Sequence, residues 1–137
     1  MERPRCQRKI RREEPRHPRF LAGSGTTAAI EDCIECHTPQ LQGGRDYANR
    51  FAAGGFEMPA SGGGTVVSAN ITPDRETGIG GWTDIQIKRA LTDGVRPDGG
   101  KLVPLMPFDH YKRVSAEDLD ALVAYLRSLK PIRNKVR

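Results

Sequence analysis

The sequence predicts a small all-α domain in which three or more helices are joined by long loops. Its 137 residues fit a single hydrophobic core. Helical spacing of apolar residues occurs in three places, and no segment alternates convincingly enough to be a strand. Hydrophobic residues make up only 36% of the chain, which also contains 15 Gly and 10 Pro. Because these residues make only a small core, we expect another group to fill part of the interior.

The first helix is expected just before two closely spaced cysteines. Thr26 or Thr27 can cap this helix, which continues toward Cys33. The following residues, 38–81, are rich in glycine and show no sustained periodicity. Loops of this length in a small domain usually surround something, so this segment is expected to wrap around the bound group.

The second helix is expected to begin after Thr83, which forms a capping box with Gln86. Apolar residues then follow at helical spacing, namely Ile87, Ala90 and Leu91. Gly94 is expected to end this helix. Residues 95–114 are expected to be irregular, because prolines occur at positions 97, 104 and 107.

The last helix is expected to begin after Ser115 and to end at Lys130 and Pro131. Acidic residues occupy its first turn, where their negative charge interacts favourably with the helix dipole. One face carries a single apolar stripe, made of Leu119, Leu122, Val123, Leu126 and Leu129. This stripe is expected to face the core.

Positive charge is concentrated at the start of the chain. The net charge is +5, and residues 1–20 carry eight basic and three acidic residues, so the remaining charges balance. We expect residues 1–20 to be a disordered basic tail, 21–131 to be the domain and 132–137 to be a short basic tail. No aromatic residues interleave the basic ones, so nucleic acid is not an expected partner. No apolar run is long enough for a transmembrane segment or a signal peptide.

One motif carries the chemistry of this chain. Cys33-Ile34-Glu35-Cys36-His37 is the C-x-x-C-H pattern of covalent c-type haem attachment. Thiols at positions i and i+3 lie on one side of a helical turn, where each can add to a haem vinyl group. The adjacent imidazole can then bind the iron. The motif therefore predicts one haem c, attached through Cys33 and Cys36, with His37 as a ligand of the iron.

Two other interpretations of the cysteines are weaker. A structural zinc ion needs four ligands, and beyond the motif the chain offers only Cys6, His17 and His110. A thioredoxin-like dithiol would need a βαβ setting, whereas the surroundings look helical and loop-like. A zinc or dithiol interaction module is thus an alternative that metal analysis can test. Cys6 has no predicted role.

The sixth iron ligand is expected to be Met106. Methionine is a common partner of histidine at electron-transfer haems. Met106 lies between Pro104 and Pro107 in a stiff loop, whereas Met58 follows two glycines, which hold the backbone less rigidly. His110 is a weaker candidate. If Met106 only fills the core, the haem would be five-coordinate and could bind gases or act on peroxide, which is the main alternative function.

Several ordered segments follow the haem motif along the chain. They are Asn70-Ile71-Thr72-Pro73-Asp74, Thr77-Gly78-Ile79-Gly80-Gly81-Trp82, Met106-Pro107-Phe108 and Ala121-Leu122-Val123-Ala124-Tyr125-Leu126. With these segments, the sequence resembles class I cytochrome c over residues 26–130. More narrowly, it is similar to the haem domains in cytochrome c subunits of bacterial alcohol, aldehyde and gluconate dehydrogenases.

This resemblance implies a small class I cytochrome c fold wrapped around one covalently bound haem. Cys33 and Cys36 would carry the thioether bonds, His37 would be the proximal ligand and Met106 the distal one. The helix leading into the cysteines would pack across the last helix.

Five further residues are candidates for contacts with the haem propionates. Asn70, Thr72 and the indole N–H of Trp82 could donate hydrogen bonds to them, and Arg75 and Arg96 could pair with them. The alternatives are that Asn70 and Thr72 only shape a turn, that Trp82 is a core aromatic and that both arginines are merely exposed.

Together these features predict a monohaem electron carrier rather than an enzyme. Its expected partners are redox proteins, such as a dehydrogenase and a terminal oxidase or another cytochrome. Such interfaces are small and transient. Because haem c is attached to reduced thiols outside the bacterial cytoplasm, the expected location is the periplasmic side.

Overall fold

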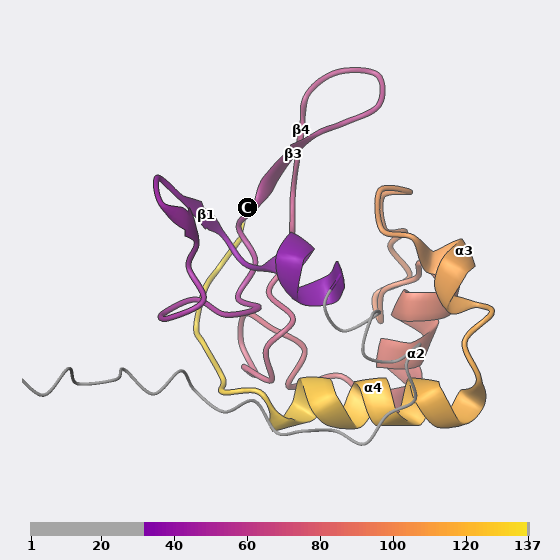
Figure 1. Ribbon diagram of the computed structural model, residues 1–137. Coiled ribbons are helices and arrows are strands. Elements are labelled where there is room, and N and C mark those ends of the chain that lie inside the picture. Colours follow the sequence, from indigo (N-terminus) through magenta and orange to yellow (C-terminus); the bar gives the residue numbers. More distant parts are fainter. Residues whose placement is uncertain (1–31, 137) are drawn as a thin grey trace, which may run out of the picture.

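The computed structural model describes residues 32–136. Residues 32–37 are helical, and the other helices are α2 (Asp84–Asp93), α3 (Phe108–Tyr111) and α4 (Ala116–Ser128) (Figure 1). α2 contacts both α3 and α4. The expected tail 1–20 and the expected cap at Thr26 or Thr27 lie outside the described residues. Across residues 32–136, none of the helices has the length and apolar character needed to cross a membrane.

The second helix follows the prediction closely. In α2 the Thr83 side chain accepts a hydrogen bond from the Gln86 backbone N–H at 3.2 Å, and the Gln86 side chain accepts from the Thr83 N–H at 2.9 Å. Gly94 ends the helix in the left-handed conformation, with φ +64°. Both ends of α2 are therefore set by local sequence signals, which fixes where its buried face begins.

The last helix also begins at its predicted cap. The Ser115 side chain accepts from the Asp118 backbone N–H at 3.1 Å, and α4 ends at Ser128, slightly before the expected stop. Arg127 joins α4 to the start of α2 by donating to Asp84 and to the Trp82 carbonyl, both at 2.6 Å. The buried residues of the stripe are Leu122, Val123, Leu126 and Leu129. They lie in one core cluster with Cys33 and Ile87.

The expectation that no strands form is wrong. β1 (Gln40–Leu41) pairs antiparallel with β2 (Gly44–Arg45), and β3 (Glu57–Pro59) pairs antiparallel with β4 (Thr65–Val67). The β3–β4 hairpin turns through glycines with positive φ, at positions 62–64, and β4 consists of β-branched residues that favour extended backbone. Strands of two or three residues are too short to produce an alternating pattern. The domain is nonetheless mainly helices and loops.

The expectation for residues 95–114 also needs correction. The segment contains the one-turn helix α3 and an isolated antiparallel bridge between Val95 and Lys101. A single turn has no helical periodicity to detect, so the sequence offered no signal for it. α3 buries Tyr111, which is 2% exposed, against the core cluster.

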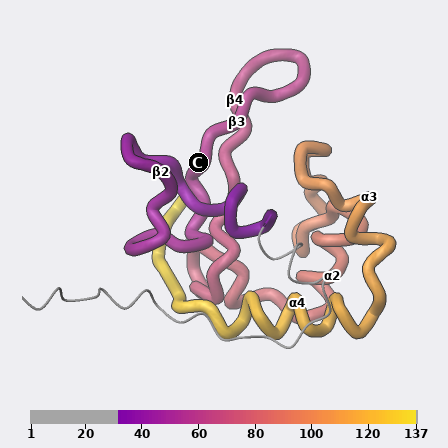
Figure 2. Tube along the Cα trace, in the orientation of Figure 1, coloured from indigo at the N-terminus to yellow at the C-terminus, as the bar shows by residue number. Residues whose placement is uncertain are grey.

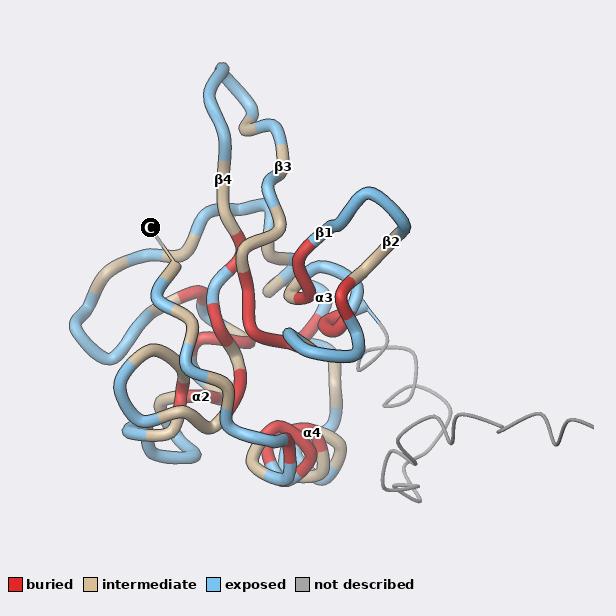
Figure 3. The backbone as a smooth tube through the Cα atoms, turned by 90° about the vertical axis from the view of Figure 1, so that its left-hand side faces the viewer, coloured by how far each residue is buried: buried red, intermediate tan, exposed pale blue. Residues whose placement is uncertain are grey.

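The chain after α4 runs back along the loops rather than away from them (Figure 2). The Asn70 Nδ2 donates to the Ile132 carbonyl at 2.8 Å, and the Asn134 Nδ2 donates to the Ala53 carbonyl at 2.8 Å. Buried residues occur along the loops as well as on α4 (Figure 3). Residues 132–136, expected to be a tail, are thus hydrogen-bonded to the domain.

Candidate functional site

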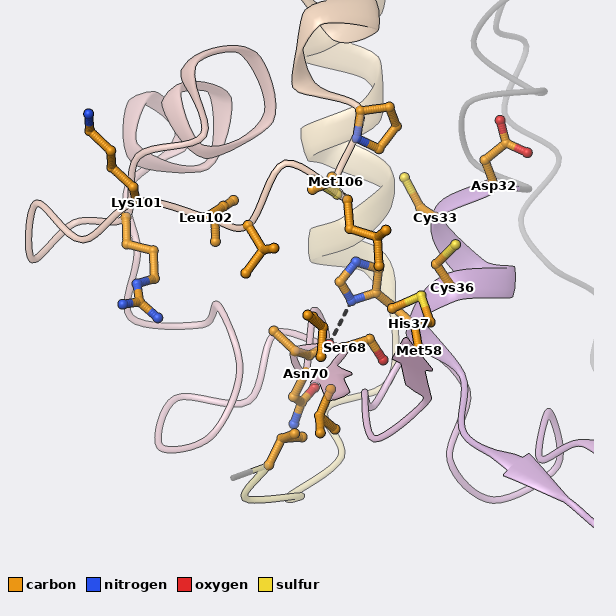
Figure 4. Close-up of a pocket in the computed structure, with 18 of the residues that line it drawn as sticks. Asp32, Cys33, Cys36, His37, Met58, Ser68, Asn70, Lys101, Leu102 and Met106 are labelled. Atoms are coloured by element: carbon orange, nitrogen blue, oxygen red, sulfur yellow. Dashed lines mark hydrogen bonds between the residues drawn. The ribbon is translucent and has the colours of Figure 1, made fainter. Parts of the chain in front are cut away.

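A cavity of about 550 Å³ lies between the helical residues 32–37, the β3–β4 hairpin and the loop before α3. Its lining brings together Cys33, Cys36, His37, Met58 and Met106 (Figure 4). Much of the remaining lining is apolar, including Val66, Val67, Leu102, Val103, Leu105 and Val136. The volume lies in the usual range for ligand and cofactor sites.

The two motif cysteines have different surroundings. Cys33 is buried, and its Sγ lies 3.4 Å from the Tyr111 hydroxyl, whereas Cys36 is exposed. Burial raises the pKa of the Cys33 thiol to about 11, and it also raises the pKa of Tyr111. Cys33 is therefore a protonated thiol at neutral pH. Both cysteines line the same cavity.

His37 is held in one tautomer. Its Nδ1 lies 2.7 Å from the Ala69 carbonyl oxygen, drawn as a dashed line in Figure 4. Because a carbonyl can only accept, Nδ1 carries the proton, and Nε2 keeps its lone pair for a metal. Burial lowers the pKa of His37, so the neutral imidazole is favoured. An oriented neutral imidazole is the form that binds iron.

Two methionines line the cavity, and they come from different segments. Met58 pairs with Val66 in the β3–β4 hairpin, which continues into Ala69, the partner of His37. Met106 lies in the turn before α3, where its N–H donates to the Val103 carbonyl at 3.1 Å and its carbonyl accepts from Phe108 at 2.8 Å. Met58 therefore belongs to the segment that also holds the histidine, and Met106 to a separate one.

Asn70 lines the cavity, whereas Thr72 and Trp82 lie outside its lining. Thr72 is fully buried and donates its N–H to the Asn70 side chain at 3.0 Å. Trp82 packs against the core cluster. A role for these three residues in binding propionates stays a prediction. The same holds for Arg96, which lines the cavity and pairs with Asp98 at 3.6 Å.

Two other predicted candidates lie away from the cavity, and the cysteine without a predicted role lies outside the described residues. Arg75 and His110 are exposed and do not line the cavity, and Cys6 is not described. Within residues 32–136, no three or more His, Cys, Asp or Glu side chains are grouped to hold a metal ion.

The sequence did not point to Tyr111, Lys135 or Val136, all of which line the cavity. Tyr111 is on a one-turn helix, and the other two follow the last helix in a segment with no periodicity. No local pattern identifies such residues, because long-range contacts bring them to the site. The only available hint was the apolar character of Tyr111 and Val136.

The donor set fits a covalently attached haem. The lining offers two thiols, an imidazole with a free Nε2, thioether sulfurs and an apolar wall. Thiols in C-x-x-C-H spacing and a histidine oriented by a backbone carbonyl suit this group.

Comparison with known proteins agrees with this geometry. The family model "Cytochrome c" matches residues 22–130. The chain is 42% identical over 106 residues to the fructose dehydrogenase cytochrome subunit of Gluconobacter japonicus, covering 77% of this chain and 20% of that protein. It is 43% identical over 106 residues to the gluconate 2-dehydrogenase cytochrome c subunit of Pantoea cypripedii, covering 77% and 21%.

A third relative comes from an alcohol dehydrogenase. The chain is 41% identical over 106 residues to the cytochrome c subunit of the alcohol dehydrogenase (quinone) of Gluconobacter oxydans, covering 77% of this chain and 20% of that protein. The chain therefore spans about a fifth of the length of these relatives.

Proposed function

The chain belongs to the cytochrome c family, and on that premise we propose that it is a single-haem electron carrier with histidine and methionine as iron ligands. The observation that carries the proposal is the gathering of Cys33, Cys36, His37 and Met106 around one cavity. A bound haem supplies an iron that takes up and releases one electron. The fold proposed for the holoprotein is that of class I cytochrome c.

Each site residue has a distinct role in this proposal. Cys33 and Cys36 hold the group covalently, and His37 presents Nε2 to the iron because Ala69 fixes its tautomer. Met106 binds the other face, where its soft thioether favours the ferrous state. Met58 is assigned to packing, since it lies on the segment that also holds His37.

The partners proposed for this chain follow from its relatives. Those relatives are named as cytochrome subunits of dehydrogenases, so we propose that the chain accepts electrons from a dehydrogenase. It would pass them to a terminal oxidase or another cytochrome and would transform no substrate itself. Because haem c is attached outside the bacterial cytoplasm, we propose that the chain carries out this function on the periplasmic side of a bacterial cell.

Replacement of each methionine tests the ligand assignment. Met106→Ala should leave the haem attached through Cys33 and Cys36, abolish the near-infrared absorption band of sulfur-ligated ferric haem and lower the reduction potential. The shift can be large, because axial ligands tune haem potentials over about 0.8 V.

Met58→Ala is the matched control and should leave the band and the potential nearly unchanged. The opposite pattern, in which only Met58→Ala removes the band, would overturn the assignment of Met106. Rapid carbon monoxide binding by the untreated protein would instead support a five-coordinate haem. A purified chain that carries no covalent haem would overturn the whole proposal.

A further inference from the structure

The residues after α4 form a strap, residues 132–136, that is fastened at two points. The Ile132 carbonyl accepts from Asn70 Nδ2 at 2.8 Å. The Asn134 N–H donates to the Thr77 hydroxyl at 2.9 Å, and its side chain donates to the Ala53 carbonyl at 2.8 Å. These bonds hold the backbone at residues 132 and 134, immediately before Lys135.

The strap reaches the cavity that holds His37. Lys135 and Val136 both line it, beside Asn70 and Thr77. The strap therefore forms part of the cavity wall and contributes one basic side chain to it. Nothing in the motif or its spacing assigns this segment a role.

The charges around the cavity are not all compensated. Charged residues in the lining are Asp32, Glu76, Arg96, Lys101 and Lys135. Arg133 of the strap pairs with Glu76 at 2.6 Å, and Arg96 pairs with Asp98 at 3.6 Å. Among the residues that the structure describes, no ion pair involves Lys101 or Lys135.

The two remaining lysines of the lining belong to different segments of the chain. The side chain of Lys101 extends away from His37 and the cysteines in Figure 4. Lys135 instead follows Asn134, whose N–H donates to the Thr77 hydroxyl, and it lines the cavity together with Asn70 and Thr77. A carboxylate that enters an apolar cavity needs a cation or hydrogen-bond donors to offset its desolvation.

We propose that the strap 132–136 is part of the haem site and holds Lys135 as the counter-ion of a haem propionate. The proposal rests on the proposed function, because haem c brings the two carboxylates that need a cation. Asn134 acts here as a positioning residue that fixes Lys135. Thr77, which accepts from Asn134 and Asn70, anchors the strap to the loop.

The charge on Lys135 has a measurable effect on the iron. Reduction adds one negative charge to the haem, so a nearby cation stabilises the ferrous state and raises the potential. Lys135→Ala should therefore lower the midpoint potential of the holoprotein. Because Lys135 is exposed and water and salt screen its charge, the shift should be smaller than that of Met106→Ala.

Four variants test this proposal by redox titration at one pH and ionic strength. Lys135→Arg keeps the charge and should retain the wild-type potential. Lys130→Ala removes an equal charge from an exposed residue outside the cavity lining and should leave the potential unchanged. If Lys101→Ala lowers the potential and Lys135→Ala does not, the proposal is wrong.

A double-mutant cycle tests the role of the strap. Asn134→Ala should lower the potential in the wild-type background and change it much less in the Lys135→Ala background, because both changes remove the same interaction. Additive shifts would overturn the positioning role of Asn134. All variants are compared only when covalent haem and its reduced spectrum are intact. Failure of the proposed role of the strap is then distinguishable from failure of the electron-carrier proposal.

Discussion

Asn70→Ala should lower the free energy of unfolding by about 3 kcal/mol, because one side chain joins two distant segments. Its Nδ2 donates to the carbonyls of Ile132 and Asn134 at 2.8 and 3.4 Å and to the Thr77 hydroxyl at 3.1 Å. Its Oδ1 accepts from the Thr72 N–H at 3.0 Å and from the Thr72 hydroxyl at 2.7 Å. The alanine side chain can make none of these contacts.

The magnitude follows from which groups keep a partner in the variant. The Thr72 hydroxyl still contacts the Ile132 carbonyl at 3.2 Å, and the Thr77 hydroxyl still accepts from Asn134 at 2.9 Å. The Thr72 N–H loses its partner in a fully buried residue. An unsatisfied buried donor costs about 1–3 kcal/mol, and each further lost bond costs roughly 1 kcal/mol.

Urea unfolding of the haem-loaded protein, followed by circular dichroism, measures this loss as a change in midpoint at constant slope. The control is Asn49→Ala, which removes a 3.2 Å bond to Asp46 from an exposed residue and should cost less than about 1 kcal/mol. If Asn70→Ala stays within about 1 kcal/mol of wild type, the side chain does not join these segments in the holoprotein.

Three further outcomes are expected from urea unfolding of the same protein. Leu122→Ala should cost about 2–5 kcal/mol, because Leu122 is 1% exposed and lies in the core cluster; a smaller loss would mean that the cluster repacks. Gly94→Ala should destabilise by more than about 1 kcal/mol, because φ is +64° and a Cβ would lie 2.8 Å from the Phe108 ring; retained stability would contradict this helix end. Hydrogen bonds from Thr77 lower the pKa of Asp74 in the folded protein. The Asp74 carboxylate therefore stabilises the fold above the ordinary carboxyl pKa of about 3.9, and this stabilisation is lost as the pH falls through the pKa of Asp74 in the folded protein. Asp74→Asn should weaken the loss of unfolding free energy at acid pH, and an unchanged dependence of stability on pH would contradict this role of Asp74.

The features that the sequence predicted are those encoded by neighbouring residues. Thr83 with Gln86 begins α2, Gly94 ends it, and Ser115 begins α4, because each cap is a contact within a few residues. The haem motif is local for the same reason. The predicted all-α fold agrees only in part with the structure, which has helices, loops and two short hairpins, whereas the comparisons confirm the cytochrome c family.

The features that the sequence did not predict depend on distant partners or on very short elements. The strap carries no periodic signal, and its bonds to Asn70 and Ala53 span 62 and 81 residues. The β3–β4 hairpin and α3 are too short for a periodic pattern. Thr72 and Trp82 were singled out by type alone, and side-chain type does not say which residues face a cavity.

The β3–β4 hairpin has a consequence for how tightly the cavity must close. A two-stranded hairpin is marginally stable by itself in water, yet Met58, Val66 and Val67 on this hairpin line the cavity. A group held only by contacts would escape into solution each time this wall opened. With the proposed thioether bonds at Cys33 and Cys36, the group stays tethered at a high effective concentration. Each opening is then followed by recapture of the same group, so retention does not depend on a rigid wall.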